Sequence, residues 1–219
     1  MLDLLLTLAA AAVGASCAIP ADLAPAPVTP AEEQRLLPTT NLVLAYYWWP
    51  QECRRDDEKG TASCAAGFGF KVHGLWPDAA NRTWPQFCAT PTPIDLKTVR
   101  ANYCTTPSPS LMQHEWAKHG TCGWPTPAAY FAQERAVAAT VTLPDVDKLP
   151  AAGLTVGAIR DAIVAANPAV PRASLFVATD RNQWLTEVRV CLDLAFKPAA
   201  CEAGDSGAAD RATVRVWPR

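Results

Sequence analysis

The chain contains 219 residues, half of which are apolar, and its formal net charge is −2. A chain of this length and apolar content can bury a substantial core, so we expect one globular domain. The near-neutral charge excludes the broad basic surface with which proteins follow long stretches of nucleic acid by neutralising phosphates. This net charge is still compatible with a local phosphate-binding site.

Residues 1–18 are typical of an export signal, because an apolar run too short to cross a membrane is followed by small residues. Val13, Gly14 and Ala15 offer a cleavage site for a secretory signal, whereas Cys17 is a candidate lipid-anchored first residue of a bacterial lipoprotein. Both alternatives predict a secreted or periplasmic protein. Disulfides persist in those compartments, and the eight cysteines contain no CxxC pair, which favours structural bridges over a zinc ribbon or a redox motif.

Residues 19–40 predict a flexible tether, because they are rich in proline, alanine and acidic residues and lack an apolar period. The folded domain is expected to comprise residues 41–219. Its first two elements are the strand-forming runs at 41–50 and 68–77, and the second run carries His73 near its end.

Helical signals follow in four segments: residues 94–103, residues 111–119, a segment that begins at Thr126-Pro127, and residues 156–166. A capping-box pattern at Ser110 and Gln113 marks the start of the second segment, and Gly120 supplies its C-terminal stop. This helix is expected to be shorter than three turns.

The last third of the chain returns to strands. Apolar and polar residues alternate from 184 to 194, which is typical of a strand with one buried face, and residues 180–182 make the turn from a preceding strand at 174–179. Residues 213–217 are expected to form a closing strand. Strands, then helices, then strands predict an α+β domain in which helices pack on a mainly antiparallel sheet.

The stretch HEWAKHGTC at 114–122 holds two of the only three histidines in the chain. On a helix, four of its side chains project from one face, within about 140 degrees of one another: His114, Glu115, Lys118 and His119. The simplest interpretation is a solvated polar face. A zinc site of the HExxH type is disfavoured, because its two histidines are four residues apart, whereas these are five apart and diverge.

A zinc site built from His114, His73 and a carboxylate is a minor alternative. Metal-free acid–base catalysis on a phosphodiester accounts for more of the pattern. Two imidazoles can exchange protons with the reacting oxygens near neutral or mildly acid pH, and a nearby lysine stabilises the negative charge that develops on the phosphate.

Two blocks resemble the ribonuclease T2 family: VHGLWPD at 72–78 is similar to its first active-site segment, and HEWAKHGTC at 114–122 to its second. Supporting similarity runs from LAYYWWPQEC through NRTWPQFC to EVRVCLD. The resemblance implies an α+β, ribonuclease T2-like fold and a cofactor-free, metal-independent endoribonuclease for single-stranded RNA. Such an enzyme forms a 2′,3′-cyclic phosphate by transesterification and hydrolyses it to a 3′-phosphate, so DNA, which lacks the 2′-hydroxyl, is not a substrate.

The family's functional residues carry over onto five matching positions. His119 is expected to be the general base and His73 the general acid of the first step, with the roles reversed in the second step. His114 is expected to bind phosphate, and Glu115 and Lys118 to stabilise the pentavalent transition state. The pattern predicts highest activity at mildly acid pH, and a binding module that has lost turnover is the non-enzymatic alternative.

The resemblance also implies a base-binding site. Trp76 and Asp78 match the family's first base site, and Trp84 has a position similar to an aromatic residue that completes it. Tryptophan is common in protein cores, so a structural role is the alternative for Trp84. Leu111 stands where an aromatic residue is common in the second base site, which predicts low base specificity.

Three disulfides follow from the resemblance: Cys53 with Cys64, Cys88 with Cys122, and Cys191 with Cys201. The second pair ties the end of the histidine helix to the loop after HGLWP. Three outcomes stay open for Cys104, namely a free thiol, a bridge to Cys17 if that residue survives processing, or displacement of one of the three pairs. We expect the protein to act as a monomer.

Overall fold

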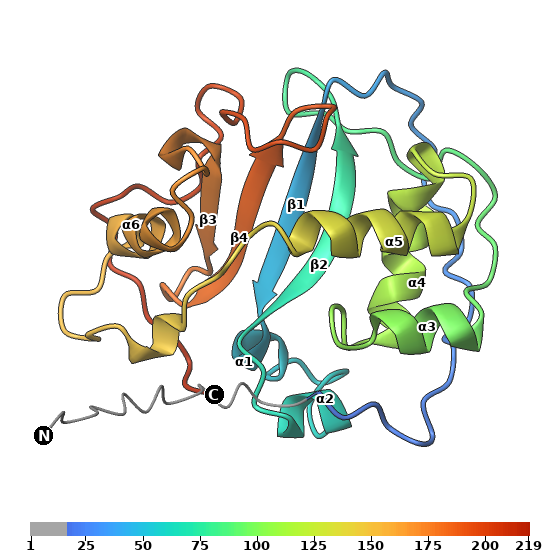
Figure 1. Cartoon of the computed structure of the whole chain (residues 1–219), viewed down its shortest axis with the longest axis horizontal. Coiled ribbons are helices and arrows are strands. Elements are labelled where there is room, and N and C mark those ends of the chain that lie inside the picture. Colours follow the sequence, from blue (N-terminus) through green and yellow to red (C-terminus); the bar gives the residue numbers. More distant parts are fainter. Residues whose placement is uncertain (1–16) are drawn as a thin grey trace, which may run out of the picture.

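A four-stranded antiparallel sheet forms the centre of the computed structural model, which describes residues 17–219 (Figure 1). The strand order is β2-β1-β4-β3, and the strands are β1 (Asn41–Trp48), β2 (Phe70–Asp78), β3 (Leu175–Thr179) and β4 (Leu185–Leu192). All neighbouring pairs are antiparallel. The α+β prediction is confirmed, whereas most of the predicted export signal lies outside the described residues.

The helices are α1 (Trp49–Glu52), α2 (Ala62–Ala65), α3 (Leu96–Asn102), α4 (Pro109–Lys118), α5 (Pro127–Ala138) and α6 (Val156–Ala166). Short 3-10 turns occur at Gly120–Cys122, Val146–Lys148 and Arg172–Ser174. Helix α5 crosses the face of β1 and β2, α4 lies near β2, and α6 lies beside β3 (Figure 1). Within residues 17–219, no helix has the length and apolar character needed to cross a membrane.

Local sequence determines where the longer helices begin. The Ser108 hydroxyl accepts a backbone hydrogen bond at the start of α4, and Thr126 and Thr155 do the same for α5 and α6. The cap predicted at Ser110 is therefore wrong by two residues. Pro109 explains the difference, because proline suits the first helical position, where its missing N–H would have had no partner in the helix.

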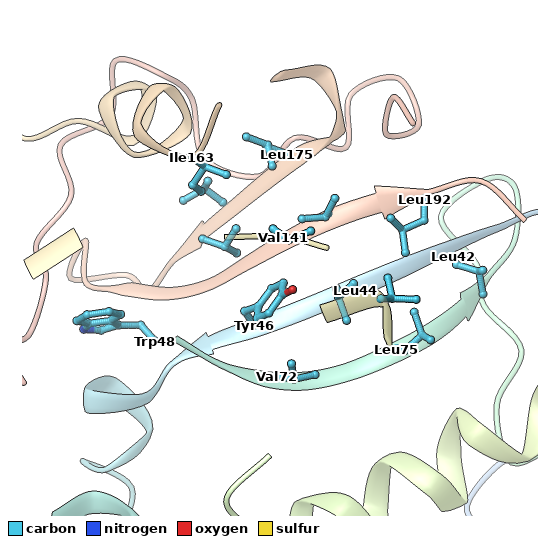
Figure 2. Packing of buried hydrophobic residues seen from close by; sticks show 14 of the residues in the cluster. Leu42, Leu44, Tyr46, Trp48, Val72, Leu75, Val141, Ile163, Leu175 and Leu192 are labelled. Atoms are coloured by element: carbon cyan, nitrogen blue, oxygen red, sulfur yellow. The ribbon is translucent and has the colours of Figure 1, made fainter. Parts of the chain in front are cut away.

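One face of the sheet carries the hydrophobic core (Figure 2). The alternation predicted for residues 184–194 holds in the second half of β4, where Val188 and Val190 are fully buried, but not at its ends, since Leu185 is also buried and Leu194 is exposed. Ile163 of α6 packs beside Leu175 of β3, and Leu75 of β2 belongs to the same core. The other face of the sheet is therefore free to carry polar side chains.

The closing strand predicted at 213–217 is wrong. This segment makes only single bridges, from Thr213 to Thr155 and from Arg215 to Trp184. A few backbone hydrogen bonds attach it, among them those that join Arg215 to Gln183 and Leu185, and side-chain stacking adds to them, since the rings of Trp184 and Trp217 lie 3.9 Å apart at an interplanar angle of 13°. Isolated bridges combined with stacking fasten the segment without extending the sheet.

The segment predicted as a tether has no helix and no multi-residue strand between residues 17 and 40, but it contacts the domain at several points. A disulfide joins Cys17 to Cys104, and the backbone of Arg35 forms an antiparallel bridge with that of Gln86. The segment is thus attached near both of its ends.

Four disulfides involve all eight cysteines. The structure contains the three pairs implied by the resemblance, Cys53–Cys64, Cys88–Cys122 and Cys191–Cys201. Of the outcomes left open for Cys104, the bridge to Cys17 is the one observed. A sulfur in this bridge cannot also carry a thioether-linked lipid, so the bridge and the alternative of a lipid anchor at Cys17 exclude each other.

Candidate active site

A cavity of about 680 Å³ opens beside the sheet face that does not carry the core. All eight residues predicted to act in catalysis or base binding line it: His73, Trp76, Asp78, Trp84, His114, Glu115, Lys118 and His119. They come from β2, from the loop after β2 and from the end of α4. The fold therefore brings the two sequence blocks together around one space.

A β-bulge in β2 places His73 and Trp76 on the same side of the sheet. Ala45 of β1 pairs with Gly74 and Tyr46 pairs with Val72, so His73 has no partner on β1. In a regular strand, residues three apart point to opposite faces, but a bulge shifts the alternation by one residue. Both rings consequently face the cavity.

Two carboxylates hold the imidazole of His73. Its Nδ1 lies 2.9 Å from Oε2 of Glu187 on β4, and its Nε2 lies 3.3 Å from Oε1 of Glu115 on α4. The ring of Tyr47 stacks on the imidazole with 3.8 Å between centroids. These contacts fix the ring at both nitrogens and on one face.

Gly74 allows α4 to approach β2 closely at this point. A Cβ atom on Gly74 would lie 2.2 Å from Oε2 of Glu115 and 2.5 Å from Nε1 of Trp76, which is far inside contact distance. The freed space holds the hydrogen bond that Trp76 Nε1 donates to Oε2 of Glu115 at 2.6 Å. Glu115, only 1% exposed, thus contacts both His73 and Trp76.

The C-terminal end of α4 supplies the remaining histidines and the lysine. His119 is the C-cap residue, its backbone N–H donates to the carbonyl of Glu115, and its ring stacks on Trp76 at 5.2 Å. His114 and Lys118 are half-buried on the cavity wall. The Lys118 carbonyl accepts a hydrogen bond from Phe87, adjacent to the Cys88–Cys122 disulfide, which ties this helix end to the loop after β2.

The two buried histidines have pKa values displaced in opposite directions. Burial alone would lower the pKa of His73, but the charge of Glu115 and hydrogen bonds to Glu115 and Glu187 raise it to about 9. Burial lowers the pKa of His119 to about 3 despite the opposing charge of Glu115. Burial would raise the pKa of Glu115, but its pairing with His73 lowers it to about 2. Near neutral pH, His73 is protonated, Glu115 is ionised and His119 is neutral.

Three residues at the site escaped the sequence interpretation: Tyr47 and Arg189, which line the cavity, and Glu187, which contacts His73. Glu187 and Arg189 form an ion pair with each other, and the Arg189 guanidinium lies 4.9 Å from the ring centroid of Trp76. The available signal was the alternation in β4, where a carboxylate and a guanidinium occupy successive positions on the face opposite the core.

The candidate base-binding residues differ in how accessible their side chains are to a ligand. The indole of Trp76 contacts His73, Glu115 and His119, so these three side chains occupy much of its surface. The Asp78 carboxylate accepts a hydrogen bond from the Asn41 amide at 2.8 Å, and burial raises its pKa. Trp84, in contrast, is 40% exposed and lines the cavity. It is the more accessible of the two tryptophans.

A zinc site that includes His73 and His114 was the minor alternative at this position. Residues 17–219 contain no cluster of three or more His, Cys, Asp or Glu side chains arranged to hold a metal ion. His114, proposed as a ligand in that alternative, instead packs edge to face with Phe87 at 6.5 Å.

Sequence comparison identifies relatives among ribonucleases. A probable ribonuclease of Haemophilus influenzae is 33% identical over 123 residues, which cover 49% of this chain and 45% of the relative. A ribonuclease of Aeromonas hydrophila is 36% identical over 84 residues, which cover 36% of this chain and 35% of the relative. The chain thus spans less than half the length of these curated relatives.

Solved structures show the same fold at lower identity. An RNase-related protein from Calystegia sepium superposes with a TM-score of 0.61 and 21% identity, covering 78% of this chain and 95% of that one. RNase NT in complex with 5′-AMP has a TM-score of 0.59 and 19% identity, and the match covers 84% of this chain and 100% of that one. Residues 39–201, most of the chain, match the Ribonuclease T2 family. The chain therefore belongs to the ribonuclease T2 family.

Proposed function

We propose that this protein is a metal-independent endoribonuclease that cleaves single-stranded RNA by transesterification and then hydrolysis. The observation that carries the proposal is that His73 from β2 and His119 from the end of α4 line one cavity together with Lys118. Their pKa values are displaced in opposite directions, to about 9 for His73 and about 3 for His119. An acid and a base whose environments separate their pKa values are the groups that proton transfer to and from a phosphodiester needs.

In the first step, His119 takes the proton from the ribose 2′-hydroxyl as its oxygen bonds to phosphorus. The bond from phosphorus to the 5′-oxygen breaks, and His73 donates its proton to that leaving oxygen. In the second step the roles reverse: His73 takes a proton from water, which attacks the 2′,3′-cyclic phosphate, and His119 returns the proton to the 2′-oxygen. Atoms and protons balance over the two steps.

We propose for Glu115 a role different from the direct transition-state stabilisation implied by family resemblance. Both of its oxygens are engaged, one with His73 and one with Trp76, and its negative charge would repel a pentavalent phosphorane. We therefore assign it to holding His73 in the protonated state. Lys118 and His114 remain as the groups that contact the phosphate oxygens.

Base binding is proposed for Trp84 and Asp78. An exposed indole offers a stacking face to any base, and a carboxyl group can accept a hydrogen bond from an exocyclic amine. Leu111 lines the cavity without an aromatic ring, which supports weak selection of the second base. Low overall base specificity follows, and DNA is expected to bind without being cleaved. Four disulfides support an exported, oxidised protein.

The proposal is tested by incubating the purified protein with an RNA dinucleotide at about pH 5 in excess EDTA and following the products by mass over time. A transient 2′,3′-cyclic phosphate that becomes a 3′-phosphate is the expected result, and His73→Ala and His119→Ala should abolish it. Cleavage that appears only when zinc replaces EDTA would contradict the histidine mechanism. No cleavage under either condition would favour the binding module.

A further inference from the structure

We infer that residues 33–35 of the N-terminal segment are part of the substrate site, because they fix the Trp84 indole as a one-sided stacking platform for an RNA base. The inference rests on the proposed function and names specificity residues for it. The contacts involved begin before residue 39, where the family match starts, so they are a property of this chain beyond the matched region.

Main-chain and side-chain hydrogen bonds join the two segments. The Arg35 N–H donates to the Gln86 carbonyl at 2.9 Å, and the Gln86 N–H donates to the Arg35 carbonyl at 3.0 Å. The Gln86 amide donates to the Glu33 carbonyl at 2.8 Å, and the Gln34 amide donates to the Phe87 carbonyl at 3.2 Å. The chain on both sides of Arg35 is therefore held against the loop that carries Trp84.

The Arg35 side chain then contacts Trp84 directly. Its guanidinium lies over the indole, 5.0 Å from the ring centroid, and its Nη1 donates to the Trp84 carbonyl at 3.1 Å. The indole Nε1 donates to Oε1 of Gln86 at 3.0 Å. One face of the ring is thus covered by a cation and its polar edge is hydrogen-bonded.

The face of the Trp84 indole that Arg35 does not cover is available for stacking with a base. The ring is still 40% exposed and lines the cavity that holds the catalytic histidines. Every base has an aromatic face, so stacking on an indole discriminates little between bases. A ring already fixed on its other side loses less conformational freedom when a base stacks on it, which favours binding.

A purely structural function of the same contacts makes a different prediction. If residues 33–35 only fasten the N-terminal segment, loss of the Arg35 side chain should change stability but not affinity. Arg100 offers a matched control, because it also contacts this segment, by donating to the Pro20 carbonyl at 3.5 Å, whereas the contacts with Trp84 are made by Arg35.

The test measures binding of a dinucleotide that lacks the attacking 2′-hydroxyl, by titration calorimetry, to wild type, Arg35→Ala, Arg100→Ala and Trp84→Ala. Arg35→Ala should weaken binding about 2- to 10-fold, because the indole would then have to be ordered when the base binds. Trp84→Ala should weaken it roughly 5- to 100-fold, as expected for one stacked base. Arg100→Ala should bind like wild type. Arg35→Gln replaces Arg35→Ala if that variant does not fold.

Two further measurements distinguish positioning of the Trp84 indole from simple attachment of the N-terminal segment. The effect of Arg35→Ala should vanish in the Trp84→Ala background, and it should vanish for an analogue without the base upstream of the scissile phosphate. The inference is overturned by unchanged affinity in Arg35→Ala, by an equal loss with the abasic analogue, or by unchanged affinity in Trp84→Ala. In each case a 2′,3′-cyclic phosphate formed by wild type would still support the proposed function, so the two can fail separately.

Discussion

Replacing Glu187 by glutamine should shift the pH range in which His73 works as an acid. The pKa of His73 is about 9 against an ordinary value of 6.5, and this difference of about 2.5 units corresponds to about 3 kcal/mol. Glu115 and Glu187 supply the raising interactions, so removal of one charge should lower the pKa by about one to two units. Glutamine can still accept a hydrogen bond, so the ring orientation is retained.

The assay is the rate of dinucleotide cleavage between pH 4 and pH 10. At pH 5 the Glu187→Gln rate should stay within about twofold of wild type, whereas at pH 8 it should fall by about two- to tenfold, because a larger fraction of His73 has lost its proton. Glu187→Asp should recover part of the loss. Glu58→Gln is the control, since Glu58 lines the same cavity and the groups that shift its pKa do not include His73.

If the cleavage rate of Glu187→Gln begins to fall at the same alkaline pH as that of wild type, this reasoning is refuted. Such a result would mean that Glu187 does not sustain the charge of His73. A uniform loss at every pH would instead indicate that the carboxylate holds the ring in place without affecting its protonation.

Three other outcomes follow from the same geometry. Gly74→Ala should lower kcat by at least tenfold, because its Cβ would meet Glu115 at 2.2 Å; wild-type kcat in a folded variant would contradict the packing argument. Replacing Cys17 and Cys104 by serine should reduce the free energy of unfolding by about 2–4 kcal/mol in urea titrations while kcat changes little; an unchanged unfolding midpoint would count against this bridge. A 2′-deoxy dinucleotide should inhibit RNA cleavage competitively and remain intact, and its hydrolysis would exclude attack by the 2′-hydroxyl.

Much of the fold and the site could be predicted from local sequence signals. The strand-forming run after residue 40 and the alternation in β4 reflect side chains that face a core on one side, so burial patterns reveal them. The helical spacing of residues 114–119 placed His114, Glu115, Lys118 and His119 toward one space, which the cavity lining matches. These features depend on neighbours in the chain.

The features that could not be predicted depend on contacts between distant segments. The bulge at His73 arises from its pairing with β1, and nothing in VHGLWPD shows that one residue lacks a partner. Glu187 is 114 residues from His73, so its role becomes visible only when β1, β2 and β4 are placed side by side. The segment at 213–217 has strand-forming residues, but a few backbone hydrogen bonds and stacking of Trp217 on Trp184 attach it instead of a ladder.

The pH dependence of wild type separates the histidine pair from substrate binding. With pKa values of about 9 for His73 and about 3 for His119, the acid stays protonated below pH 9 and the base stays neutral above pH 3. The pair alone therefore gives a broad plateau instead of the mildly acid optimum expected from unshifted imidazoles. Burial raises the pKa of Asp78, and protonation of this group would act on substrate binding. We expect kcat to be flat from about pH 5 to pH 8, and any change in kcat/KM that Asp78 causes should be absent in Asp78→Asn; a kcat that falls steeply from pH 5 to pH 7 would show that His73 is not held protonated by its carboxylates.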